Sequence, residues 1–440
     1  MTKVIVIGGG PAGMSAASRI KRLKPEYNVT VFEKSNYVSY GQCGIPYYVG
    51  GIVKNLEDLV HYSKEYFINK RKINVFTRTE VVDIGEGYVI SKNDGGEKKF
   101  NWDILVLATG ARPIVPPTKG INLEGIITVR TLEDAEICKK LSLKAENVGV
   151  VGGGYIGLEM AENFIKLGKK TYLFEMLPHV LPNIDSDMSW LIESELKKRG
   201  VELHLSEKVI GFEGENKVEK IITEKGEYKI DLVIMAVGVR PDNSLAKKLG
   251  LKLGVKGAVS VDEYTRTSNE NVYAVGDIAE TFDIVTGNKT WVPLATTANK
   301  MGYVAGSNIG GKSIKFPGIV GTAITKIFDL EVGRTGLSEE QSKMLNIETV
   351  TTKIKAKTRP TYYPGGREIT IKLIADKEGR LLGGQFIGRD VLPRLNALAS
   401  LLFKKSTVWD AFFDDLAYSP VFAPVWDPLV AAGRVLLRNF

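Results

Sequence analysis

The stretch VIVIGGGPAG, residues 4–13, decides the fold. Its β-branched start is typical of a strand buried on both faces of a parallel sheet. Gly8, Gly10 and Gly13 follow with the spacing G-x-G-x-x-G, which allows a tight turn, close approach to a pyrophosphate, and close packing of the next helix. A helix from Met14 to about Lys24 and a strand over 29–32 complete the unit. The stretch therefore predicts a dinucleotide-binding fold.

Three further features belong to this first unit. Glu33 ends its second strand, at the distance from Gly13 where a carboxylate accepts hydrogen bonds from an adenosine ribose. The strand over 102–110 ends in Ala-Thr-Gly, small residues that can pass close to a dinucleotide. The strand over 271–277 ends in Gly-Asp and can place Asp277 on the ribityl or phosphate part of a flavin dinucleotide.

The same pattern returns later in the chain. A strand over 148–151 leads into Gly152, Gly154 and Gly157, then a helix, a strand over 171–174 and Glu175. Such a repeat predicts a second dinucleotide site. A carboxylate at position 175 favours NADH and repels a 2′-phosphate, although Lys169, Lys170 and His179 nearby leave NADPH possible.

From about residue 318 the pattern changes to alternating segments with turn signals, which predict an antiparallel sheet. Strands are expected over 322–328, 347–355, 368–375 and 381–387, and helices over 391–404 and 406–416. The fold class is therefore α/β, with two Rossmann-like domains and a C-terminal α+β domain. We predict these domains at 1–112 with 260–317, at 113–259, and at 318–440.

The composition of the 440 residues is that of a globular protein, with 44% hydrophobic and 25% charged residues. The net charge of +8 comes without a dense Lys/Arg block, so no nucleic-acid partner is expected. Two cysteines favour a reducing, cytoplasmic setting. The chain runs directly into a strand, not a signal peptide, and no apolar run reaches the ~18 residues of a membrane span. No metal site is predicted.

The candidate for chemistry is the loop SYGQCGIPYY, residues 39–48, which contains Cys43. A lone cysteine is usually a small buried hydrophobe, and Cys138, in a Lys-rich helical stretch, is interpreted in that way. Ser15, Arg19 and Arg22 share one helix face by their spacing. That face is either a solvated basic stripe or a site for a phosphate-rich substrate, and the residues alone leave both open.

Taken together, these motifs resemble the flavin-dependent pyridine nucleotide-disulfide oxidoreductases over essentially the whole chain. The loop is similar to that of their single-cysteine branch, the coenzyme A-disulfide reductases and CoA-dependent NAD(P)H sulfur oxidoreductases. Tyr48 stands where a two-cysteine reductase has its second cysteine, and Pro11 stands where oxidases and peroxidases have a histidine. The three histidines, at 61, 179 and 204, include no C-terminal base.

The resemblance implies FAD, NAD(P)H and coenzyme A as cofactors or substrates, and a homodimer. Implied FAD contacts are Gly8, Gly10, Pro11, Ala12, Gly13, Glu33, Lys34, Val81, Thr109, Gly110, Arg130, Asp277 and Ala295. Implied NAD(P) contacts are Gly152, Gly154, Tyr155, Ile156, Gly157, Glu159, Glu175 and Gly238. Implied CoA contacts are Ser15, Arg19, Arg22, Ser39, Gln42, Arg71 and Asn299. The implied catalytic residues are Cys43 with Tyr418, Tyr362 and Tyr363, the tyrosines coming from the partner subunit.

The expected reaction carries electrons from NAD(P)H through flavin to Cys43 and on to a CoA-linked disulfide, polysulfide or elemental sulfur. Cys43 reacts only as a thiolate. A helix N-terminus after Gly44 and the flavin are the two candidate sources of a depressed pKa, which the sequence leaves open, and no histidine is expected near Cys43. The alternatives are an NADH oxidase, an electron-transfer flavoprotein for a protein partner, and a redox sensor. The acceptor and the choice between NADH and NADPH remain open from the sequence.

Overall fold

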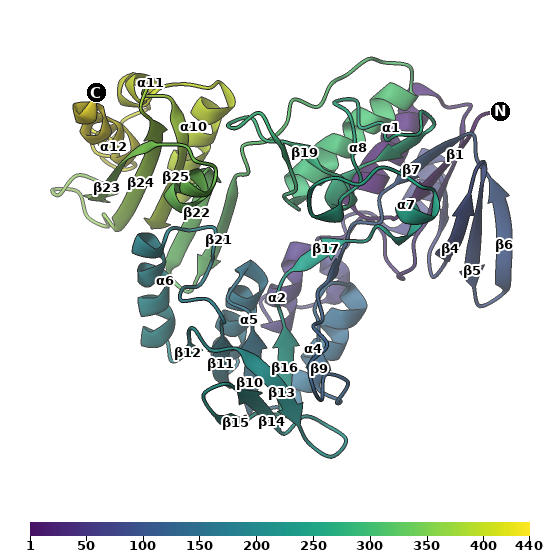
Figure 1. Ribbon diagram of the computed structural model, residues 1–440, viewed down its shortest axis with the longest axis horizontal. Coiled ribbons are helices and arrows are strands. Elements are labelled where there is room, and N and C mark those ends of the chain that lie inside the picture. The colour runs from purple at the N-terminus through teal and green to yellow at the C-terminus, as the bar shows by residue number, and fades with distance from the viewer.

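The computed structural model describes residues 1–440, and its first region is built on a five-stranded parallel sheet (Figure 1). In spatial order the strands are β18 (Val272–Ala274), β7 (Ile104–Leu107), β1 (Lys3–Ile7), β2 (Asn28–Phe32) and β3 (Asn74–Phe76). Every neighbouring pair is parallel. The predicted β-branched strand is β1, whose last four residues are buried.

Two helices, α1 (Pro11–Leu23) and α8 (Ala295–Ile309), pack against each other beside this sheet. Helix α1 begins at Pro11, earlier than the expected Met14, because proline suits the first turn of a helix. The two backbones approach closely at Gly302 and Gly306 of α8. A Cβ on Gly302 would lie 2.2 Å from a backbone oxygen of α1, and one on Gly306 would lie 2.6 Å from another.

The second region repeats this architecture. Its parallel strands, in spatial order, are β12 (Glu202–His204), β11 (Lys170–Phe174), β10 (Asn147–Val151), β16 (Leu232–Met235) and β9 (Ile126–Ile127). Its helices are α4 (Leu132–Lys144), α5 (Tyr155–Lys166) and α6 (Ser186–Lys198). The predicted α/β class with two Rossmann-like units is confirmed.

The C-terminal region carries the predicted antiparallel sheet. In spatial order its strands are β21 (Ala323–Ile327), β22 (Leu330–Gly336), β25 (Leu381–Gly388), β24 (Glu368–Asp376) and β23 (Thr349–Lys357). The helices are α9 (Glu339–Met344), α10 (Val391–Phe403), α11 (Val408–Phe413) and α12 (Pro428–Leu436). Strand β22 and helix α12 were not predicted.

The structure also contains four smaller sheets. They are β4 (Glu80–Gly85), β5 (Tyr88–Asn93) and β6 (Gly96–Asn101); β13 (Val209–Glu213), β14 (Lys220–Thr223) and β15 (Glu227–Lys229); β8 (Ala111–Pro113) with β17 (Val239–Pro241); and β19 (Thr281–Phe282) with β20 (Lys289–Thr290). A short helix, α7 (Ser244–Lys248), follows β17. The β8–β17 ribbon joins the segments that leave β7 and β16, so it ties the first two regions together.

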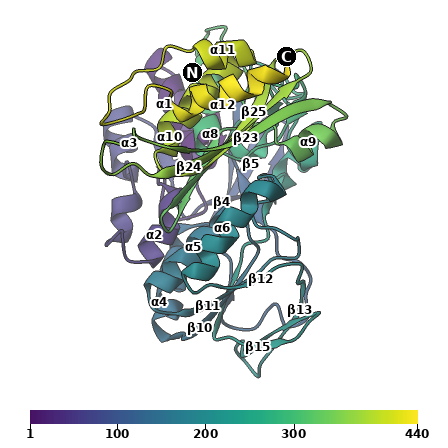
Figure 2. The ribbon, with the colours of Figure 1, turned by 90° about the vertical axis from the view of Figure 1, so that its left-hand side faces the viewer.

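A buried ion cluster fixes the second region against the third. Lys372 of β24 is 4% exposed and lies 3.1 Å from Asp185, 2.8 Å from Asp187 and 2.8 Å from Glu339. Gln385 of β25 donates to Asp185 at 2.7 Å. Asp185 is the N-cap of α6, and Figure 2 shows α6 below the C-terminal sheet. The charges in this cluster are paired, as burial requires.

The cysteine loop is held between the first two regions. The 3-10 helix η1 (Gln42–Gly44) runs into α2 (Ile45–Val49), which packs against α4 and α5. A Cβ on Gly50, at the end of α2, would lie 1.9 Å from an oxygen of Asn163. The expected helical region over 55–72 is instead divided into η2 (Leu56–Leu59) and α3 (Lys64–Arg71).

No helix of the structure combines the length and apolar character that a membrane crossing requires. The structure also contains no group of three or more His, Cys, Asp or Glu side chains placed to hold a metal ion. The domain boundaries given above remain a prediction.

Candidate active site

The two glycine turns have the same geometry. Gly8 has φ +110° and Gly152 has φ +109°, a region that residues with a side chain rarely adopt. A Cβ on Gly13 would lie 1.9 Å from the carbonyl oxygen of Gly8, and one on Gly157 would lie 1.9 Å from that of Gly152. The first and third glycines are therefore required by the fold itself.

The middle glycines are different because the space beside them is open. A Cβ on Gly10 or Gly154 would meet no heavy atom within 4 Å. Helices α1 and α5 begin at the next residue, so their unpaired N–H groups and positive dipole ends face this space. An open space at a helix N-terminus fits a pyrophosphate, as the spacing of the glycines predicts.

The two carboxylates predicted to bind a ribose, those of Glu33 and Glu175, make the same hydrogen bonds in the two folds. Glu33 accepts from the backbone N–H of Gly9 at 2.7 Å, and Glu175 accepts from that of Gly153 at 2.7 Å. Each carboxylate also accepts from a backbone N–H two residues further along the chain, at 2.8 Å and 2.9 Å respectively. These bonds hold both carboxylates next to the glycine turns.

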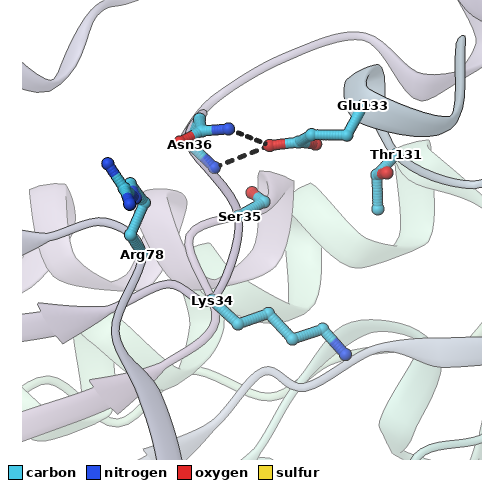
Figure 3. A pocket seen from close by; sticks show the side chains of 6 residues that line it. All are labelled: Lys34, Ser35, Asn36, Arg78, Thr131 and Glu133. Carbon is cyan, nitrogen blue, oxygen red and sulfur yellow. Dashed lines mark hydrogen bonds between the residues drawn. The ribbon is translucent and has the colours of Figure 1, made fainter. Parts of the chain in front are cut away.

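A polar pocket of about 410 Å³ lies beside Glu33 (Figure 3). It is lined by Lys34, Ser35, Asn36, Arg78, Thr131 and Glu133. One oxygen of Glu133 accepts from both the backbone and the side-chain amide of Asn36, each at 2.8 Å, and the other oxygen has no partner. The pocket places the implied FAD residue Lys34 among hydrogen-bonding groups suited to the polar end of a nucleotide.

Two other implied FAD residues form an ion pair. Arg130 lies 3.1 Å from Asp277, and the two side chains are 23% and 16% exposed. The carbonyl of Asp277 accepts from the indole N–H of Trp291 at 2.8 Å. The position that a Cβ on Gly110 would occupy is 3.5 Å from the Arg130 guanidinium. The structure therefore brings Gly110, Arg130 and Asp277 together from three separate segments.

Cys43 is accessible to solvent, whereas Cys138 is fully buried in α4. The protein around Cys43 raises the pKa of its thiol, mainly through burial and also through the negative charge of Glu159, with Arg130 acting in the opposite direction. The five-residue helix α2, which begins after Gly44, does not reverse this direction.

A half-buried carboxyl group, that of Glu159 on α5, lies near Cys43. Burial raises the pKa of Glu159, and the hydroxyl of Thr325 on β21 donates to it at 2.7 Å. Burial, together with the nearby Glu159, Glu162 and Cys43, raises the pKa of Tyr47 to about 12. Thr325 was not singled out by the sequence, because only the packing of β21 on α5 brings it here.

Four of the seven implied CoA residues gather on the outer face of α1 and α8. The hydroxyl of Ser15 donates to the carbonyl of Asn299 at 2.9 Å. The guanidinium of Arg19 donates to Ser307 at 2.9 Å and lies 4.4 Å from the ring centre of Tyr303. Arg22 is the fourth, and its side chain is exposed.

Ser39 and Gln42 belong to the cysteine loop. Ser39 has φ +53° and donates its N–H to the carbonyl of Gly9 at 2.9 Å, so the loop starts at the first glycine turn. The side chain of Gln42 lies beside the hydroxyl of Tyr40, whose pKa is raised to about 12 by burial. Arg71, the last implied CoA residue, ends α3.

The structure brings one histidine, His61, next to the cysteine loop. Tyr40 and Val60 form an antiparallel bridge, and the N–H of His61 donates to the carbonyl of Ser39 at 2.9 Å. The His61 ring nitrogen Nε2 is 3.4 Å from the position that a Cβ on Gly41 would occupy. Sequence spacing carries no signal for this pairing, because it depends on the chain returning after α2.

The implied catalytic tyrosines separate into two groups. The hydroxyls of Tyr362 and Tyr418 are 3.3 Å apart, and both side chains are exposed. Tyr363 instead lies under Arg359, whose guanidinium is 5.8 Å from its ring centre. None of the three hydrogen-bonds Cys43 within the chain, so the structure pairs Tyr362 with Tyr418 and sets Tyr363 apart.

Comparison with known families agrees with this geometry. Residues 2–302 match the family described as "Pyridine nucleotide-disulphide oxidoreductase", and residues 322–429 match the dimerisation domain of the same family. The chain belongs to the pyridine nucleotide-disulphide oxidoreductases. Family membership implies FAD and NAD(P)H. This oxidoreductase has two glycine turns with open space, each beside a carboxylate, and this arrangement fits two dinucleotides.

Relatives of this oxidoreductase match along almost the entire chain. An enzyme of Pyrococcus horikoshii named "NAD(P)H coenzyme A polysulfide/persulfide reductase" is 50% identical over 99% of this chain and 98% of its own length. The "NAD(P)H sulfur oxidoreductase (CoA-dependent)" of Pyrococcus furiosus is 49% identical over 99% of both chains. The solved structure of an NAD-dependent persulfide reductase from A. fulgidus superposes with a TM-score of 0.97 at 38% identity, covering 100% of this chain and 83% of that one.

The remaining implied residues of the oxidoreductase are distributed over its first two regions. Those implied for FAD are Val81, buried in β4; Thr109, which donates to the carbonyl of Asp242 at 2.9 Å; and Ala295, which opens α8. Those implied for NAD(P) are Tyr155 and Ile156, in the first turn of α5, and Gly238, with φ +110°. Their cofactor roles stay predictions.

Proposed function

We propose that the protein is a CoA-dependent NAD(P)H sulfur oxidoreductase, which reduces CoA-linked disulfides, persulfides or polysulfides. The observation that carries the proposal is a single accessible thiol, Cys43, next to the first dinucleotide turn, with the other cysteine fully buried. Because no second thiol of the chain can close a disulfide with Cys43, its sulfur partner has to be supplied by the substrate. The names of the Pyrococcus relatives support coenzyme A as that partner.

The chemistry follows from thiol–disulfide exchange. The Cys43 thiolate attacks the CoA sulfur of a disulfide, which forms a Cys43–CoA mixed disulfide and releases the other sulfur as a thiolate. Two electrons from NAD(P)H and one proton then return Cys43 to the thiolate and release CoA as its thiol. FAD, when bound, supplies the two-electron transfer from NAD(P)H to sulfur. For a CoA persulfide, the same two electrons with two protons give CoA thiol and hydrogen sulfide.

The residues around Cys43 have distinct proposed tasks. Arg130 favours the thiolate, and Tyr47, whose pKa is about 12, stays protonated and can donate a hydrogen bond. Arg19 and Arg22 present guanidinium groups suited to the phosphates of CoA through charge-assisted hydrogen bonds. Ser307 and Tyr303 hold the Arg19 guanidinium in place before any ligand arrives.

A homodimer is part of the proposal. The match to a dimerisation domain over residues 322–429 supports it. The same region exposes Phe422, Val425 and Trp426, each by 49% or more. Such exposed apolar residues are typical of an interface. The exposed Tyr362–Tyr418 pair would then face the Cys43 site of the partner subunit, where it can hydrogen-bond a leaving thiolate.

The test compares acceptors under strict exclusion of oxygen. We expect NADH oxidation with polysulfide to depend on added CoA, and CoA disulfide to be reduced directly. Oxygen consumption with NADH, measured separately in air, should be slow. If NADH oxidation does not depend on CoA and is fast with oxygen as the acceptor, the result would instead support an NADH oxidase.

A further inference from the structure

The segment at the end of β12 binds the backbone of Glu175 on both sides. The N–H of Glu175 donates to the carbonyl of His204 at 2.8 Å, and its carbonyl accepts from the N–H of Glu207 at 3.0 Å. Ser206, with φ +49°, turns the chain and donates its N–H to the carbonyl of Leu177 at 2.9 Å. The carboxylate predicted to bind a ribose is therefore fixed through its own backbone by a neighbouring strand.

A cluster of three rings lies against the residue that precedes Glu175. The rings of His204 and Phe174 stack with centres 4.8 Å apart and planes 17° apart. The ring of Tyr228, from β15, meets both edge-on, with its centre 5.0 Å from that of Phe174 and 4.6 Å from that of His204. Because Phe174 is joined to Glu175 and the carbonyl of His204 accepts from Glu175, a shift of the His204 ring would move the carboxylate.

The carboxylate of Glu207 fixes this ring cluster by hydrogen bonds. It is buried, and its Oε1 accepts from the hydroxyls of Thr223 and Tyr228, each at 2.7 Å. Its Oε2 lies 3.2 Å from Nδ1 of His204. Burial acts to raise the pKa of Glu207, but these hydrogen bonds and the nearby His204 outweigh burial, so the pKa is lowered. A buried carboxylate with this many partners makes the cluster rigid.

The first fold contains the same arrangement built from three phenylalanines. Phe76, at the end of β3, accepts from the N–H of Glu33 at 2.8 Å and stacks on Phe32 with centres 5.5 Å apart and planes 18° apart. Phe100 of β6 meets Phe32 edge-on at 4.9 Å. The N–H of Thr79 donates to the carbonyl of Glu33 at 2.9 Å. One geometry made twice from different side chains indicates that the ring cluster belongs to the dinucleotide site.

We infer that His204 is a positioning residue for NAD(P)H, because its ring and its carbonyl hold the Glu175 carboxylate where the adenosine ribose binds. The position requires a flat ring against Phe174 and not an imidazole as such, since Phe76 occupies the matching position in the first fold. Glu207 and Tyr228 keep this ring in place. The inference goes beyond the sulfur chemistry and rests on the assignment of the second glycine fold to NAD(P)H.

The first experiment measures binding of ADP-ribose to the flavin-loaded protein by calorimetry. ADP-ribose carries the adenosine ribose of NADH without the nicotinamide, so it reports binding without turnover. In His204→Ala, the Kd for ADP-ribose and the KM for NADH should rise about fivefold, within the range of coupling between neighbouring residues. The kcat for reduction of an artificial dye should be unchanged. His204→Phe restores the ring and should bind ADP-ribose like the wild type.

A second experiment asks whether His204 acts through Glu175. In the wild type, Glu175→Gln should lower the preference for NADH over NADPH by about tenfold. In His204→Ala, the same substitution should lower it by less than about threefold, because the carboxylate is already displaced. A tenfold effect in both proteins would mean that the two residues act independently and would overturn the inference.

Phe76→Ala is the matched variant in the first fold. It should speed the release of flavin on dilution and leave the binding of ADP-ribose to the flavin-loaded protein unchanged. His204→Leu fills the space without a flat ring, so it replaces His204→Ala if that variant does not fold, and it should also weaken ADP-ribose binding.

Two results would contradict the role given to His204. One is a His204→Phe variant that binds ADP-ribose as weakly as His204→Ala. The other is a lower melting temperature in His204→Ala or His204→Leu with unchanged ADP-ribose binding, which would make His204 a core residue only. These measurements contain neither CoA nor sulfur, so a failure of the proposed function would leave them unaffected.

Discussion

The two glycine folds of the chain share their recognition geometry and differ in the segment that comes after their second strand. Their first glycines have φ values of +110° and +109°, and their carboxylates accept from the glycine turns at the same 2.7 Å. After Glu33, however, the chain enters the loop that carries Cys43. After Glu175 it instead enters α6, whose N-cap is buried in the Lys372 ion cluster.

This difference separates binding from chemistry. A dinucleotide turn needs only backbone geometry and a carboxylate, and the chain builds it twice. Reactivity depends on the segment inserted after the second strand, and only the first fold has an accessible thiol there. The second fold is anchored to the C-terminal sheet through Lys372 and through the bond from Thr325 to Glu159.

The largest effect is expected from a substitution that removes the reactive thiol and leaves both dinucleotide-binding folds intact. Cys43→Ser should lower reduction of CoA disulfide and polysulfide by about 10³-fold or more, the usual consequence of deleting a nucleophile. Electron transfer from NADH to an artificial dye should persist, because no dye step requires the thiol. Cys138→Ser is the control and should keep sulfur reduction. Full sulfur reduction by Cys43→Ser would show that the first fold does not owe its chemistry to this loop.

The next effect tests whether the two middle glycines are equivalent. Because neither has a neighbour within 4 Å, Gly10→Ala and Gly154→Ala should both fold. Gly10→Ala should lose flavin on purification, whereas Gly154→Ala should keep flavin and weaken NADH binding by about tenfold or more, as one misplaced methyl does in a pocket. Flavin absorbance and KM for NADH measure these outcomes.

The matched variant Gly157→Ala should destabilise the fold itself, since its Cβ would lie 1.9 Å from a backbone oxygen. Overpacking of this kind costs about 1–3 kcal/mol, measurable by thermal unfolding. Weak NADH binding without destabilisation in Gly157→Ala would contradict the division between the fold-forming and ligand-facing glycines.

A smaller effect concerns the second carboxylate. Glu175→Gln removes the charge that repels a 2′-phosphate but keeps an oxygen to accept from Gly153. The preference for NADH over NADPH, measured as the ratio of kcat/KM, should fall by about tenfold, in the range of a hydrogen bond to a charged group. Glu33→Gln should leave this ratio unchanged. A ratio that moves with Glu33 and not with Glu175 would exchange the cofactors assigned to the two folds.

The smallest effect is expected from a residue of the second fold, Glu159, that acts on the thiol of the first fold, Cys43. Burial raises the pKa of Cys43 and the negative charge of Glu159 raises it further, so the thiolate fraction grows only as the pH rises toward that raised pKa. Glu159→Gln removes the charge, lowers the pKa and should speed alkylation of Cys43 by iodoacetamide at neutral pH, by less than about tenfold for a charge of this kind. Glu136→Gln, on the surface of α4, should not. Slower alkylation in Glu159→Gln would reverse the sign of this coupling.

Most of the fold was predictable because its signals are local. Glycine spacing and β-branched runs identified both parallel units, and alternation identified four strands of the third sheet. Strand β22 was not predicted, because its buried part contains Arg334, Thr335 and two glycines, a composition typical of a turn. Gly333 is needed there because a Cβ would lie 2.7 Å from Leu395 of α10. Helix α12 was not predicted, because it begins at Pro428, after a proline-rich stretch.

The site was predictable where residues are set by motif and not where they are set by packing. Glu33 and Glu175 lie at fixed distances from glycines, so spacing alone identified them, whereas Cys43 was identified by the resemblance of its loop to the single-cysteine branch. His61 reaches the cysteine loop through the return of the chain after α2, and Thr325 reaches Glu159 through β21. The direction of the Cys43 pKa shift depends on packing of the same kind, and for that reason the motif left it open.

The most direct test of the central claim is the intact mass of the protein after incubation with CoA disulfide and removal of the excess. The account predicts an adduct of one CoA per chain, lost on treatment with dithiothreitol and absent in Cys43→Ser. A bare thiol, or an adduct of oxygen alone on Cys43, would contradict the mixed disulfide and with it the role given to the loop of the first fold.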